Sequence, residues 1–62
     1  SHTGGDQSFV LCLLDENLDG IVISSLHSRE NTRLYAKKVE GGKVTTQALS
    51  KEEQEVINEA IK

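Results

Sequence analysis

The segment LLDENLDGIVI places oxygen-bearing side chains at alternate positions, as calcium-binding loops do. Asp15, Asn17 and Asp19 followed by Gly20 match the start of the pattern D-x-[DN]-x-[DN]-G, whose carboxylate and amide oxygens bind the ion. The twelfth position of such a loop needs a bidentate Glu, and here it falls on Leu26. The flanking residues are typical of strands, so a tight turn in which Asp19-Gly20 supplies the positive φ explains the pattern better. We therefore expect no metal site, and weak calcium binding through Asp15, Asn17 and Asp19 is the alternative.

Two further groups of residues suggest chemistry, but each lacks the other residues that a metal site or a catalytic site needs. Cys12 is the only cysteine, so the chain has no intrachain disulfide, and with one credible histidine it has too few ligands for zinc. Its neighbours Leu11 and Leu13 predict a buried, unreactive thiol. His27 and Ser28 suggest a hydrolase, but adjacent residues on an extended chain point apart, and no oxyanion-hole glycine motif accompanies them. We predict no catalytic residue, no cofactor and no enzymatic activity.

A basic strip with one aromatic residue remains as a candidate recognition site. Arg33, Tyr35 and Lys37 alternate along one predicted strand, and Arg29 and Glu30 precede it in a polar loop. Such a strip could hold a phosphate group or an acidic partner, whereas the alternative is a solvated face whose lysines discourage edge-to-edge aggregation. The formal net charge of −3 argues against nucleic acid as the partner. We predict partner binding through these five residues, the partner being another protein or a second copy of the chain.

Alternation of apolar residues predicts strands over residues 8–14, 20–26, 32–40 and 43–48. Gly41-Gly42 joins the last two as a two-residue turn with positive φ at both positions. Residues 50–62 are typical of a helix, because Ser50 and Glu53 form a capping box before an apolar stripe. The stripe consists of Val56, Ile57, Ala60 and Ile61.

These elements predict a small α+β fold, an antiparallel β-meander of three to four strands with one C-terminal helix packed on one face. We interpret residues 1–3 as a tag remnant or disordered end and residues 4–62 as a single domain, which at this size buries only roughly 60% of its unfolded surface. The first strand is apolar on both sides, with Phe9, Leu11 and Leu13 on one face. The second face is therefore curled away, covered by a missing part of the protein, or paired with a second copy.

The order of these pieces resembles a bacterial family known as domain of unknown function 4446. The resemblance covers the chain from Gly4 onward and rests on the following segments: Gly4-Gly5-Asp6, the turn Asp15 to Gly20, Ser28-Arg29-Glu30 with Arg33, Tyr35-Ala36-Lys37, and Leu49-Ser50. It implies a short Firmicutes protein with an N-terminal membrane helix, a charged coiled coil and this domain at its C-terminus. The domain would then be a soluble head on the cytoplasmic side, attached to the membrane only through an N-terminal segment absent here. The resemblance implies no activity.

Overall fold

The computed structural model describes the backbone of residues 6–62 and the side chains of residues 9–62. The interpretation of residues 1–3 as a tag remnant, and the Gly4-Gly5 part of the family resemblance, lie outside the described residues.

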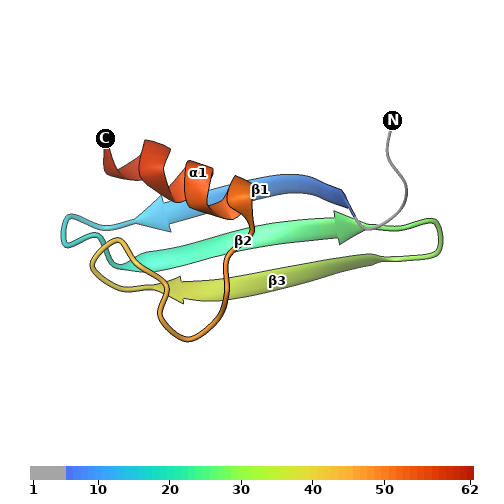
Figure 1. Ribbon diagram of the computed structural model, residues 1–62, viewed down its shortest axis with the longest axis horizontal. Coiled ribbons are helices and arrows are strands. Elements are labelled where there is room, and N and C mark those ends of the chain that lie inside the picture. The colour runs from blue at the N-terminus through green and yellow to red at the C-terminus, as the bar shows by residue number, and fades with distance from the viewer. Residues whose placement is uncertain (1–5) are drawn as a thin grey trace.

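The fold is a three-stranded antiparallel sheet with one helix on one of its faces (Figure 1). β1 (Asp6–Leu14), β2 (Gly20–His27) and β3 (Thr32–Val39) lie side by side in the order in which they occur along the chain, and α1 (Lys51–Ile61) follows. The predicted α+β meander with a C-terminal helix is therefore confirmed. Figure 1 also shows that α1 lies over the end of the sheet nearest the β1–β2 turn, so the opposite end extends beyond the helix.

The prediction of a fourth strand over residues 43–48 is wrong. Gly41 and Gly42 do form the expected turn, with φ of +60° and +82°, and Glu40 and Lys43 exchange two backbone hydrogen bonds of 2.8 and 3.0 Å across it. Pairing stops at this single bridge. The chain instead turns back toward the helix-bearing face, where Val44 and Leu49 pack against the core. Burying Val44 and Leu49 and positioning α1 stabilises the fold more than further strand pairing of this polar, threonine-rich segment would.

The core is small and lies between α1 and the end of the sheet that α1 covers. Val22, Val39 and Ile57 are fully buried, and half-buried apolar side chains pack around them: Val10, Cys12, Leu14, Val44 and Leu49. The predicted division of β1 into two faces is confirmed, because the helix covers the face that carries Val10, Cys12 and Leu14.

The predicted apolar stripe of α1 is only partly confirmed. Ile57 is buried and Val56 is half-buried, but Ala60 and Ile61 are exposed. The buried position one turn before Ile57 is instead occupied by Glu53. The buried face of the helix is therefore displaced toward its N-terminus, where a carboxylate enters the interior.

The β1–β2 turn differs from the expectation in the residue that takes positive φ. Leu18, not Asp19-Gly20, adopts the left-handed conformation, with a φ of +65°. Gly20 is needed for a different reason, since a Cβ at this position would lie 1.9 Å from the carbonyl oxygen of Leu13. The two backbones approach too closely there for any side chain.

Candidate interaction surface

The sheet face opposite α1 is an apolar surface that the described part of the chain leaves exposed, and we call it the open face. Strand alternation and register place on it a largely apolar group with Lys38 at one end, and His27 and Thr32 at the other end; the group consists of Phe9, Leu11, Leu13, Ile21, Ile23, Ser25, Leu34 and Ala36. Its four largest exposed side chains are those of Phe9, Leu11, Leu13 and Leu34, with exposed fractions of 51%, 47%, 56% and 66%. Large apolar residues exposed side by side on one face are typical of an interaction surface.

The register arranges the part of the open face between the His27–Thr32 pair and the β1–β2 turn in three rows that cross the strands. They are Phe9–Ser25–Leu34, Leu11–Ile23–Ala36 and Leu13–Ile21–Lys38. The large side chains of β1 form a ridge along one edge of the face. The central strand lies lower, since Ser25 is buried and Ile21 and Ile23 are half-buried. Ala36 leaves a second low point, on β3.

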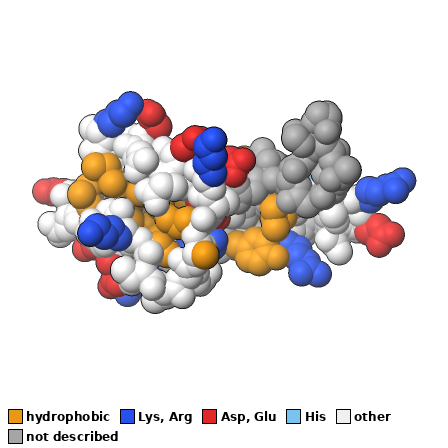
Figure 2. Space-filling model, viewed as in Figure 1, with side chains coloured by type: hydrophobic (Ala, Val, Ile, Leu, Met, Phe, Trp, Pro, Cys, Tyr) orange, Lys and Arg blue, Asp and Glu red, His pale blue; other side chains and the backbone are white. Residues whose placement is uncertain are grey.

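Among the side chains of residues 9–62, Lys38 is the one Lys, Arg, Asp or Glu that the three strands place on the open face, and it lies at the margin. The ammonium of Lys38 lies 3.5 Å from the carboxylate of Glu40, and both side chains are exposed. The helix-bearing side is different, because Figure 2 shows acidic and basic side chains distributed around the apolar ones there. The two sides of the sheet therefore present different chemistry to solvent.

Under the helix, a buried carboxylate joins three parts of the chain. Glu53 is 1% exposed, and its Oε1 accepts hydrogen bonds of 2.8 Å from Lys37 Nζ and from the backbone N–H of Ser50. Its Oε2 accepts a hydrogen bond of 2.8 Å from Ser24 Oγ. The Ser50 hydroxyl in turn accepts from the Glu53 N–H at 3.1 Å, which completes the predicted capping box. The helix start is thereby fixed on β2 and β3.

The surroundings of Glu53 keep it ionised. Burial alone would raise the pKa of this carboxyl, but the hydrogen bonds from Lys37, Ser50 and Ser24 and the charge of Lys37 outweigh burial. Together they lower the pKa of Glu53 from 4.5 to about 2. The Glu53–Lys37 pair is consequently charged at neutral pH.

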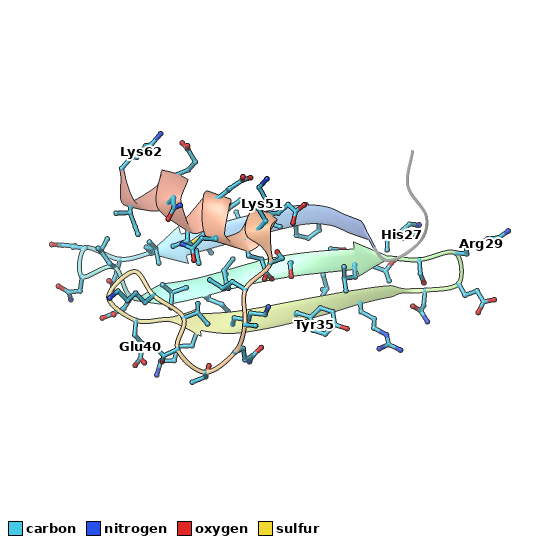
Figure 3. All side chains as sticks on the ribbon, viewed as in Figure 1. His27, Arg29, Tyr35, Glu40, Lys51 and Lys62 are labelled. Atoms are coloured by element: carbon cyan, nitrogen blue, oxygen red, sulfur yellow. The ribbon has the colours of Figure 1, made fainter. Side chains whose placement is uncertain are left out.

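The five residues predicted to bind a partner fall into two groups. Arg29 and Glu30 are exposed in the turn between β2 and β3, and Arg33 and Tyr35 are exposed on the helix-bearing side of β3. Figure 3 shows Arg29 at the tip farthest from α1, and Tyr35 between that tip and the helix-covered end. Lys37 shares their face but is 16% exposed, and its ammonium is bound to Glu53 and to the Ala48 carbonyl at 2.8 Å. The structure therefore assigns Lys37 to the interior network.

His27 and Ser28, which suggested a hydrolase, form hydrogen bonds at the β2–β3 turn and not with each other. Ser28 Oγ donates to the backbone carbonyl of Asn31 at 3.0 Å, and the Ser28 N–H donates to the same carbonyl at 2.8 Å. His27 Nδ1 lies 2.9 Å from the hydroxyl of Thr32, its neighbour across the strands. The two side chains thus hold the turn and the strand ends.

The carboxylates of the calcium-like loop bind backbone amides. Asp15 Oδ1 accepts from the N–H groups of Asn17 and Asp19 at 2.8 and 3.0 Å. Asp19 Oδ1 accepts from the Gly41 N–H at 2.9 Å, which ties this loop to the second turn. The side chains of residues 9–62 contain no group of three or more His, Cys, Asp and Glu placed to hold a metal ion. The calcium-like spacing of these residues is therefore explained by the hydrogen bonds that form the turn.

Cys12 faces α1 and is half-buried beside the core. Burial raises the pKa of its thiol, which lowers the fraction of reactive thiolate at neutral pH. Its role in the structure is therefore packing.

Sequence reasoning missed the buried role of Glu53. Sequence patterns assign this residue only to the capping box with Ser50. The signal lay in the strands, where Ser24 and Lys37 occupy inward-facing positions next to Val22 and Val39. Polar residues at two core positions indicate that a third polar group must enter the core to satisfy them.

Comparison with known proteins identifies a family. The family model described as "Protein of unknown function (DUF4446)" matches residues 1–61. No curated protein and no solved structure matches the chain. No helix in the described part of the chain is long and apolar enough to cross a membrane.

Proposed function

The chain belongs to the DUF4446 family, and we propose that it is a non-enzymatic interaction module that binds a protein through the open face. The observation that carries this proposal is the exposure of Phe9, Leu11, Leu13 and Leu34 on one face of the sheet. Removing apolar surface from water is favourable by about 25 cal/mol per Å², before the entropic costs of association are subtracted. Covering the apolar open face therefore releases more free energy than covering the charged helix-bearing side would.

The interpretation as a non-enzyme is supported by how the polar side chains are used. Ser28, His27 and Asp15, which the sequence suggested for chemistry, hold turns and strand ends. Glu53 and Lys37 bind each other beneath the helix. The polar tip at Arg29 and Glu30 and the neighbouring Arg33 and Tyr35 lie outside the open face, and their role in partner binding stays a prediction. Calcium binding, the alternative, loses support because Asp15 and Asp19 already accept amide hydrogen bonds.

The family resemblance supports a further part of the proposal, the place of the module in a longer protein. We propose that it forms the C-terminal head of a membrane-anchored bacterial protein, on the cytoplasmic side. Protease treatment of right-side-out and inside-out membrane vesicles tests this orientation. Cleavage of the domain in right-side-out vesicles would contradict it.

The interaction itself is tested by thiol labelling in cells that produce the protein. In a Cys12→Ser background, Leu34→Cys places a single thiol on the open face, and Glu55→Cys places one on the exposed side of α1. A covered open face predicts that the thiol at position 34 is labelled several-fold more slowly in cells than in the dilute isolated domain. The thiol at position 55 should be labelled equally in both. Equal rates for position 34 in cells and in isolation would overturn the proposal.

A further inference from the structure

We infer that the occupant of the open face is a second copy of this chain, bound so that β1 of each copy lies over β3 of the other. This inference rests on the proposed function and names the partner of the same surface. Its basis is the shape, the area and the charge of the open face.

Two copies of the open face can be stacked about a two-fold axis across the strands or along them, and only the second places the β1 ridge over the low point at Ala36. The large side chains of β1 form a ridge, while β3 has a low point at Ala36 and β2 lies lower between them. A two-fold axis across the strands would stack the β1 ridge of one copy on the β1 ridge of the other. The low points would then face each other across a gap, and such a void forfeits the contacts on which packing depends.

A two-fold axis along the strands fits the relief of the central row, where the β1 ridge meets the low point at Ala36. It preserves the order of the rows and exchanges the two edges, so β1 of one copy faces β3 of its partner. In the central row this places Leu11 of each copy over Ala36 of the other. In the outer rows Phe9 faces Leu34, and Leu13 faces the alkyl chain of Lys38. Stacked sheets lie about 10 Å apart with their strands within about 30° of each other, so the central row is the most closely aligned.

The available area suits a reversible dimer. The four large side chains of the open face are roughly half exposed, which leaves on the order of 100 Å² of each for a partner. With the remaining atoms of both faces, the stacked pair would bury roughly 1,200 Å², at the lower end of specific interfaces. We therefore expect association that depends on concentration.

The charges are compatible with this arrangement. Lys38 lies at the margin of the face, so its ammonium can remain in water while its alkyl chain is covered. Each copy carries a formal net charge of −3, so the copies repel each other at long range. Added salt screens this repulsion and strengthens apolar contact, so the dimer should become tighter as ionic strength rises.

Sedimentation equilibrium from about 5 µM to about 1 mM tests self-association, because weak interfaces dissociate in this range. We expect a monomer–dimer equilibrium that Leu11→Lys shifts at least tenfold toward monomer. Ile61→Lys is the matched control, since it places the same charge on an apolar side chain that is 40% exposed on α1. It should leave the equilibrium unchanged, and circular dichroism should show that both variants are folded.

Cross-linking of single-cysteine chains tests the arrangement. Leu11→Cys and Ala36→Cys, each in a Cys12→Ser background, have one thiol per chain, so any cross-link joins two copies. A short bis-maleimide should link the two variants when they are mixed, and should link neither efficiently to itself. Preferential linkage of Leu11→Cys to itself would overturn the β1-over-β3 arrangement.

A monomer at all concentrations would overturn the second copy as the occupant. The proposed function has a separate test. Slow labelling of position 34 in cells, together with a monomer in solution, would leave the interaction module standing with a different protein as its partner. Fast labelling in cells would remove both proposals.

Discussion

Replacing Glu53 by Gln should reveal how much of the stability comes from one buried charge. The carboxyl pKa is lowered from 4.5 to about 2, and a difference of that size corresponds to roughly 3 kcal/mol of folding free energy. A chain of this length has a total unfolding free energy of roughly 3 to 9 kcal/mol. The ionised carboxylate of Glu53, with its hydrogen bonds from Lys37, Ser50 and Ser24, therefore contributes a large part of the folding free energy.

The direction of the pH dependence follows from the lowered pKa. Above about pH 5 the carboxylate is charged in both the folded and the unfolded chain, and its full contribution is present. As the pH falls from about 5 to about 2, the unfolded chain takes up a proton first, and the contribution is lost. Glu53→Gln keeps the shape and one carbonyl oxygen but has no charge at any pH. We expect it to lower the unfolding free energy by roughly 2 to 3 kcal/mol at pH 7 and by much less near pH 2.5.

Urea unfolding followed by far-UV circular dichroism at several pH values between 7 and 2.5 measures this difference. Glu59→Gln is the matched control, because the Glu59–Lys62 pair lies in the same helix with both side chains more than 70% exposed. It should change the unfolding free energy by less than about 0.5 kcal/mol. If Glu53→Gln lost stability between pH 5 and 2.5 as steeply as the unaltered protein, the acid sensitivity would arise elsewhere and the reasoning would be refuted.

Three further substitutions and one thiol reaction test the local geometry. Gly20→Ala should lower the urea midpoint far more than Gly41→Ala does. A Cβ at position 20 would collide with the Leu13 carbonyl oxygen, whereas a Cβ at position 41 would meet open space. Gly41 has a φ of +60°, so Gly41→Ala should lower the unfolding free energy by about 1 kcal/mol. Ser50→Ala removes the side-chain half of the capping box and should cost about 1 kcal/mol, measured by thermal unfolding. Cys12 should react with iodoacetamide at pH 8 more slowly than in urea-unfolded protein, since burial raises the pKa of its thiol, and equal rates would contradict that account.

Sequence patterns predicted the elements whose signals are local. The capping box of Ser50 with Glu53 and the paired glycines after Glu40 each act over four residues, and both appear as expected. The two faces of β1 follow from alternation alone, which is why the open face could be anticipated from the residues around Leu11. The sequence also left open which face the helix covers, because that choice depends on packing between segments far apart in the chain.

The errors arose where tertiary contacts outweigh local preference. Residues 43–48 have the composition of an edge strand, but burying Val44 and Leu49 and returning the chain to α1 stops the pairing. Lys37 reads as part of an exposed basic strip, and its true environment depends on a carboxylate sixteen residues away. Such contacts leave no periodic signal in a single sequence. They show only as polar residues at inward-facing positions, as Ser24 and Lys37 do.

The position of α1 over one end of the sheet has a consequence for motion. The strand segments around Val22 and Val39 are backed by the helix, whereas the segments approaching His27 and Thr32 extend beyond it (Figure 1). Backbone amides at the covered end should exchange with deuterium only through global unfolding, and those near the β2–β3 turn through local fraying. The row of Phe9 and Leu34 lies toward the fraying end, so a protein bound there would stiffen the region that the helix leaves unsupported. Recognition and completion of the fold would then be a single event along the same strands.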